Sequence, residues 1–99
     1  MSFKKTTITI SNSIYGEREQ AAYAKDGIAI SRVGKAWGVF HNASQTEIYY
    51  KLQRRTKAEA TKVAEQILEL PVDWHKSKDD LRFVEQIVRA NLDIRRIAG

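Results

Sequence analysis

Apolar and polar residues alternate over the first half of the chain, which is typical of strands with one buried face. Asp26-Gly27 and Gly34-Lys35 interrupt the alternation and predict turns, because glycine and Asp-Gly tolerate the positive φ angles of tight hairpins. Strands are therefore expected over residues 4–11, 19–25, 27–33, 35–41 and 47–53, with a loop over 11–18. Alanines make residues 19–25 compatible with a helix as well, but the Asp-Gly turn that follows favours a strand.

In the second half the apolar period changes to that of a helix, over residues 56–70 and 78–97. Thr56 and Glu59 form a capping box, in which the hydroxyl takes a helix N–H and the glutamate reaches back to the threonine N–H. Pro71 ends the first helix, and Ser77 starts the second in the same manner.

Strands followed by helices predict an α+β fold. We expect one domain over residues 1–99, built as an antiparallel meander of four to five strands followed by two helices packed on one sheet face.

The apolar positions also predict which side chains meet in the core. One sheet face and the helical stripes should bury Trp37, Ile48, Leu52, Val63, Ile67 and Val88 together, with Tyr50 on the same inward face. Trp74 should fold back over the end of the sheet. The second helix carries two adjacent apolar stripes, Leu81, Val84 and Val88, and Phe83, Ile87, Ala90, Ile94 and Ile97. A band this broad predicts contact on two sides, and hence a homodimer through residues 81–97 that uses Phe83, Ile87 and Ile94.

The opposite sheet face is expected to carry Phe40 and Tyr49 among Lys5 and Lys51, with Tyr23 and Lys25 nearby. Two interpretations stay open. Aromatic rings among lysines can stack on bases while the charges hold phosphates, or the second helix or a partner covers the rings.

Charge is distributed unevenly along the chain. The net charge is +5, and residues 1–55 hold nine Lys or Arg against four Asp or Glu, whereas residues 56–99 hold eight of each. The excess positive charge therefore lies in the half that is predicted to form the sheet. The chain has no cysteine and no run of eighteen apolar residues, so we expect a cytoplasmic protein without a membrane partner.

Catalytic patterns are missing from the sequence. His41 and His75 lack neighbours at ligand spacing, and no nucleophile elbow or phosphate-binding glycine loop occurs. We expect a non-enzymatic protein without metal or cofactor. Asp79 and Asp80 suit the electrostatics of a first helical turn, and Arg89 is expected to pair with Glu85 and Asp93 at helical spacing.

A basic cluster marks the junction between the last predicted strand and the first helix: Lys51, Arg54, Arg55 and Lys57. Cations at a helix N-terminus oppose the helix dipole, whereas a bound anion would be stabilised by the dipole and the cations together. The cluster is either an anion site or a solvated basic turn.

The order of elements over residues 34–68 carries a resemblance. A strand opens with Gly34-Lys35-Ala36-Trp37, the next holds Ile48-Tyr49-Tyr50, and the helix begins Arg55-Thr56-Lys57-Ala58-Glu59-Ala60. This run resembles the three-stranded-sheet-plus-helix DNA-binding domains of plant ethylene-response factors and the arm-binding domains of phage integrases. The resemblance implies a sheet lying in the DNA major groove, with Arg32, Lys35, Tyr49 and Lys51 near the DNA.

Taken together, these patterns predict a small binding protein of phage or mobile-element type. It would engage DNA, RNA or a nucleoprotein complex through its basic sheet half. The alternative is a protein–protein inhibitor or assembly factor, such as an anti-defence protein, that acts through the apolar second helix and exposed aromatic residues.

Overall fold

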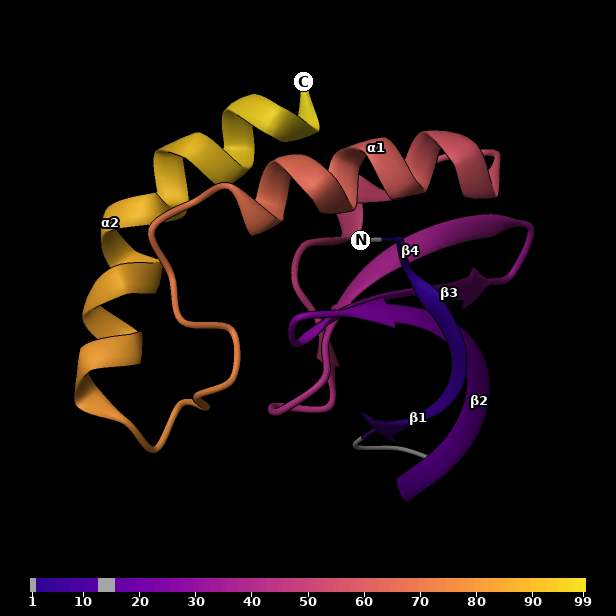
Figure 1. The fold of residues 1–99 in the computed structure, drawn as a ribbon, viewed down its shortest axis with the longest axis horizontal. Coiled ribbons are helices and arrows are strands. Elements are labelled where there is room, and N and C mark those ends of the chain that lie inside the picture. Colours follow the sequence, from indigo (N-terminus) through magenta and orange to yellow (C-terminus); the bar gives the residue numbers. More distant parts are fainter. Residues whose placement is uncertain (1, 13–15) are drawn as a thin grey trace.

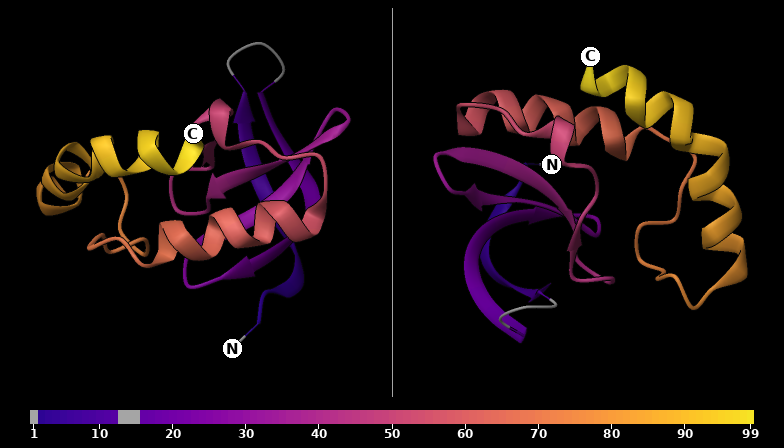
Figure 2. Two further views of the ribbon diagram at one scale, coloured as in Figure 1. Left: turned by 90° about the horizontal axis from the view of Figure 1, so that it is seen from above. Right: turned by 180° about the vertical axis from the view of Figure 1, so that it is seen from behind.

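The computed structural model describes residues 2–12 and 16–99, and it confirms an α+β fold in which an antiparallel meander precedes two helices (Figure 1). One five-stranded sheet has the order β1-β2-β3-β4-β5. The elements are β1 (Lys4–Asn12), β2 (Gly16–Lys25), β3 (Ile28–Val33), β4 (Ala36–His41), β5 (Thr46–Glu47), the 3₁₀ helix η1 (Tyr50–Leu52), α1 (Lys57–Leu68) and α2 (Leu81–Ala98). Helix α1 lies across the sheet, whereas α2 stands beside it (Figure 2).

The two predicted hairpin turns are present. Asp26 and Gly27 have φ angles of 50° and 89°, so both adopt the left-handed conformation that a two-residue hairpin between β2 and β3 requires. Gly27 also lies against the backbone of Trp74, where an added Cβ would be 2.6 Å from the carbonyl oxygen. The turn therefore needs glycine for its conformation and for space.

The main core lies between the sheet and the helices. Its buried side chains come from β3, β4, η1, both helices and the segment between them: Ile28, Ile30, Val39, Leu52, Ala60, Val63, Ala64, Ile67, Trp74, Phe83, Ala90 and Ile94. Trp37 and Ile48 are half-buried against this cluster. Trp74 is buried as predicted, and its indole N–H donates to the Ile67 carbonyl at 3.2 Å.

Phe40 lies on the other sheet face as predicted, but it is buried there and not presented to solvent. The sheet rolls until β1 reaches the β4–β5 turn, where the Ser11 N–H donates to the Gln45 carbonyl at 2.9 Å. Inside the roll, Ile8, Ala22, Ala29 and Phe40 form a second buried cluster. Tyr23, which pairs with Lys5 and Ile30, lies on the α1 face instead.

Several element boundaries also differ from the predictions. The predicted strand over residues 47–53 is present only at its first residue: β5 ends at Glu47, and η1 then directs Leu52 into the core while Tyr50 is 63% exposed. The 3₁₀ turn is stabilised by two backbone hydrogen bonds, in which the Leu52 and Gln53 N–H groups donate to the carbonyls of Tyr49 and Tyr50. The predicted loop over 11–18 is wrong at its ends, because β1 runs to Asn12 and β2 starts at Gly16. Ser13 lies outside the described residues.

Both helices start later than predicted. Thr56 caps α1 by accepting from the Glu59 N–H, but the glutamate carboxylate accepts from the threonine hydroxyl rather than from its N–H. Asp80, and not Ser77, caps α2, because its carboxylate accepts from the Phe83 N–H at 3.1 Å.

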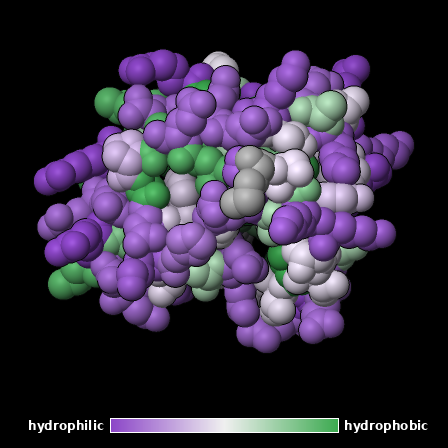
Figure 3. Space-filling model, viewed as in Figure 1, coloured by the Kyte–Doolittle hydropathy of each residue, from purple (hydrophilic) through white to green (hydrophobic). Residues whose placement is uncertain are grey.

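The two predicted apolar stripes of α2 differ in burial: one packs into the core, and the other faces solvent. Phe83, Ala90 and Ile94 are buried, so the predicted exposed patch of Phe83, Ile87 and Ile94 is wrong. The exposed residues are instead Leu81 (82%), Val84 (38%), Val88 (69%) and Leu92 (71%), which we call the apolar stripe of α2. Val88 was therefore wrongly assigned to the core. In Figure 3 apolar side chains reach the surface on the side where α2 lies.

The predicted ion pairs of Arg89 are absent as well. Over residues 2–12 and 16–99 the structure has a single salt bridge, between Arg96 and Asp93 at 3.2 Å. Neither Glu85 nor Arg89 takes part in it, and both are exposed.

Candidate nucleic-acid interface

Two half-buried aromatic rings meet beside the N-terminus of α1. Tyr23 and Trp37 lie with ring centroids 6.4 Å apart, and each has a cation over its ring. Lys57 Nζ is 3.3 Å from the Tyr23 centroid, and the Arg32 guanidinium carbon is 5.4 Å from the Trp37 ring. We call these four residues the aromatic–basic surface.

Strand register produces this surface. Arg32 and Trp37 are directly opposed in the β3–β4 pair, and Tyr23 opposes Lys5 in the β1–β2 pair. Each side chain points to the α1 face, because neighbours across strands share a face. Lys57 is the first residue of α1 and reaches the Tyr23 ring from above the sheet. The geometry of this surface thus follows from the register of the strands and from the position at which α1 begins.

Four of the predicted site residues belong to this surface or adjoin it in the chain. Arg32 and Lys57 are part of it. Lys35 lies in the turn that leads to Trp37, and Arg55 precedes the helix cap. All four are exposed, so their charges are available to an anionic partner.

Arg54 is held by backbone contacts. Its backbone N–H and carbonyl both bond to Trp37, at 2.9 and 2.8 Å. Its guanidinium donates to four carbonyls, those of Lys51 and Gln53 next to it and those of Ile97 and Ala98 at the end of α2. A cation there suits the negative end of the helix dipole. Arg54 therefore joins the junction to the C-terminus of α2.

The two remaining predicted residues lie elsewhere. Lys51 is on η1, with its ammonium 5.9 Å from the Tyr50 ring. Tyr49 packs edge-on against Tyr50 and lines a pocket between the sheet and α2. The structure thus divides the predicted site residues into a basic part beside Tyr23 and Trp37, a structural arginine, Lys51 on η1, and Tyr49 in the pocket.

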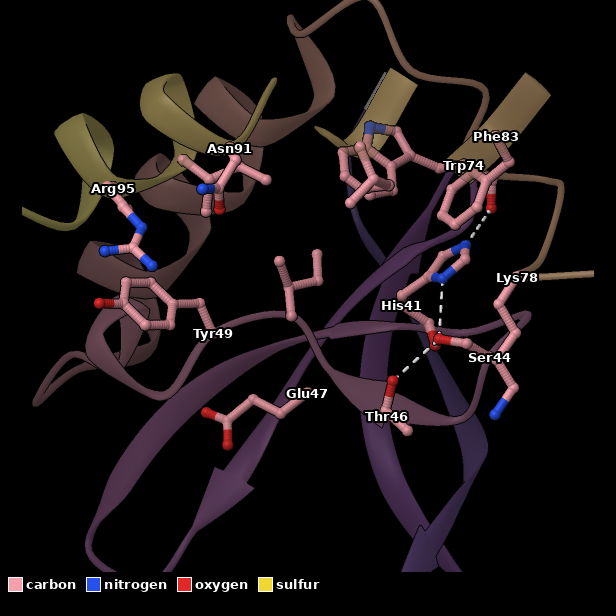
Figure 4. A pocket seen from close by; sticks show the side chains of 13 residues that line it. His41, Ser44, Thr46, Glu47, Tyr49, Trp74, Lys78, Phe83, Asn91 and Arg95 are labelled. Carbon is pink, nitrogen blue, oxygen red and sulfur yellow. Dashed lines mark hydrogen bonds between the residues drawn. The ribbon is translucent and has the colours of Figure 1, made fainter. Parts of the chain in front are cut away.

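This pocket, of about 290 Å³, has His41 among the residues that line it (Figure 4). The imidazole stacks on Phe83 at 4.9 Å, and its Nε2 lies 2.8 Å from the Trp74 carbonyl oxygen. A carbonyl only accepts, so Nε2 carries the proton and Nδ1 accepts from the Ser44 hydroxyl at 2.8 Å. Burial lowers the pKa of His41 from 6.5, although its contacts with the backbone of Trp74 and Lys76 act in the opposite direction. These partners hold His41 as a neutral structural link between β4, the interhelical segment and α2.

Across the described parts of the chain, no group of three or more His, Asp or Glu side chains could hold a metal ion. Neither helix described here is long and apolar enough to cross a membrane.

Reasoning from sequence missed Trp37 as a member of the candidate site, because alternation placed it in the core. It placed Tyr23 beside rings that could stack on bases, but on the wrong sheet face. A signal was present in the pattern, since Arg32 and Trp37 are equally spaced from the Gly34-Lys35 turn and must be neighbours in a tight hairpin.

No protein-family model, curated protein or solved structure matches this chain.

Proposed function

We propose that this protein binds single-stranded nucleic acid through the aromatic–basic surface. The main observation that supports this proposal is the pair of half-buried rings, Tyr23 and Trp37, with a cation over each. Bases stack on aromatic side chains whatever their sequence, and neighbouring Lys and Arg hold the phosphates.

A surface that binds by stacking on aromatic rings favours single strands over duplexes. Stacking requires an unpaired base, which a duplex does not offer without unstacking. The face opposite α1, where Phe40 lies, is enclosed by the rolled sheet. We therefore place the contact on the α1 side, with Lys5, Lys35 and Arg55 extending the basic track.

Charge neutralisation tests this proposal. The double variant Arg32→Gln, Lys57→Gln should bind labelled single-stranded oligonucleotides more weakly in fluorescence anisotropy. The slope of log affinity against log salt should flatten by about 0.7 for each phosphate that the variant no longer neutralises. The matched control, Lys62→Gln with Arg18→Gln, removes two exposed cations of the same kinds and should retain the wild-type slope.

A second readout reports on the stacking itself. Trp74 is buried, so quenching of tryptophan fluorescence on binding should come from Trp37 and disappear in Trp37→Phe, with circular dichroism confirming that the variant folds. Absence of salt-dependent binding by the wild type to single-stranded DNA or RNA would overturn the proposal and favour the protein–protein inhibitor hypothesis. Equal reductions in affinity in both double variants would show that binding does not use the aromatic–basic surface.

A further inference from the structure

The apolar stripe of α2 lies on the side of the helix that faces away from the core. Leu81, Val84, Val88 and Leu92 follow one another at helical spacing. At about 100° per residue this line lies nearly opposite the buried line of Phe83, Ala90 and Ile94. Four large apolar side chains in a row, of which three are more than two-thirds exposed, exceed the scattered apolar residues that are normal on a monomer.

We infer that this stripe binds a second copy of the same chain, with the two α2 helices antiparallel. The argument for this occupant is charge complementarity. One flank of the stripe carries Arg82, Glu85, Arg89 and Arg96, with Asp93 at its outer edge, where it pairs with Arg96 of the same helix. When two antiparallel helices meet about a two-fold axis, each flank faces the same flank of the partner helix in reverse order.

One register satisfies the charges and the apolar residues together. Setting Glu85 level with Arg89 of the second copy also sets Arg89 level with Glu85 of that copy. The same register brings Arg82 near the level of Asp93 of the second copy, and it staggers the four stripe residues between those of the other helix. Glu85 and Arg89 take part in no salt bridge within the described chain, so both remain available across the interface.

Other arrangements lack this match. In a parallel pair the charged flank would face the opposite flank, which offers Arg95 as its only charged residue. Two helix faces make a small contact, at the low end of the size of specific interfaces, so the dimer should be weak and dependent on concentration.

Sedimentation velocity of the whole chain at rising concentration tests the inference. The wild type, of 11.3 kDa, should shift from monomer to dimer, and Val88→Glu should remain monomeric with an unchanged circular dichroism spectrum. A wild type that stays monomeric at high micromolar concentration would overturn the inference, as would a Val88→Glu variant that still dimerises.

Charge exchange tests the antiparallel register. Glu85→Arg and Arg89→Glu should each weaken self-association, because like charges then meet twice across the two-fold axis. An equimolar mixture of the two single variants should associate again, since every arginine then faces a glutamate. Changes within one helix cannot produce that recovery, so a mixture that stays monomeric would show that the register is wrong.

Discussion

Helices α1 and α2 differ in how much of their apolar surface the fold buries. In α1 the four residues Ala60, Val63, Ala64 and Ile67 are all buried, because the helix lies across the sheet and needs only one apolar face. Helix α2 stands beside the sheet and buries one stripe, while a second stripe of leucine and valine residues faces solvent. The comparison shows that a helix can carry more apolar surface than its own fold buries, and this unburied surface is the basis of the contact that we infer for α2.

The largest expected effect contrasts one apolar residue from each helix. Ile67→Ala should lower the free energy of unfolding by about 2–5 kcal/mol, because it leaves a cavity in the main core. Leu92→Ala removes a similar side chain from the apolar stripe of α2 and should change stability by no more than about 0.5 kcal/mol. Urea denaturation at low protein concentration, where the proposed dimer is dissociated, measures both. Comparable losses of stability would contradict the distinction between the two helices.

An intermediate effect is expected where the segment before α1 is bonded to the end of α2. Arg54→Ala removes the hydrogen bonds to Ile97 and Ala98 and should cost about 1–3 kcal/mol. Hydrogen exchange should report the weakening most strongly in the last turn of α2. Arg55→Ala is the matched control, since its side chain is exposed, and should change stability by no more than about 0.5 kcal/mol. Equal effects of the two variants would show that Arg54 does not fix α2.

The smallest effect concerns pH. Burial lowers the pKa of His41 in the folded state below 6.5, so the unfolded chain binds a proton more readily than the folded chain between these two values. Stability from this residue is complete above pH 6.5 and decreases as the pH falls toward the folded pKa. Chemical denaturation at a series of pH values should show this slope in the wild type and in His75→Gln. The slope should be reduced in His41→Gln, and its persistence there would assign it to other groups.

Local chemistry made much of the fold predictable. The Asp26-Gly27 turn and the Thr56 cap each depend on a few adjacent residues, and both occur where the sequence places them. Over residues 47–53 the same reasoning failed, because an alternating pattern cannot distinguish a strand from a 3₁₀ turn that directs only Leu52 inward. The exposed stripe was also misassigned, since the sequence shows two apolar stripes on α2 but not which one meets the core.

The candidate site was predictable only in part. Its basic residues Arg32 and Lys57 stand out as charges near a predicted turn and a predicted helix start. The approach of Tyr23 to Trp37 depends on how far the sheet rolls, because curvature brings side chains from β2 and β4 together over the intervening strand. Curvature also encloses Phe40, and the alternation of apolar and polar residues does not reveal how strongly a sheet curves.

The rolled sheet also has a consequence for aggregation. A meander has two edge strands, and an open edge invites strands from other molecules to add to it. Here β1 turns back to bond Gln45 through Ser11, and β5 at the other edge is only two residues long. Lys4 and Lys5 place positive charge on the remaining edge. The bond to Gln45 near one end of β1 and the two lysines at the other end thus hinder β-addition along this edge, so we expect copies of this chain to meet through side chains of α2 rather than through their sheets.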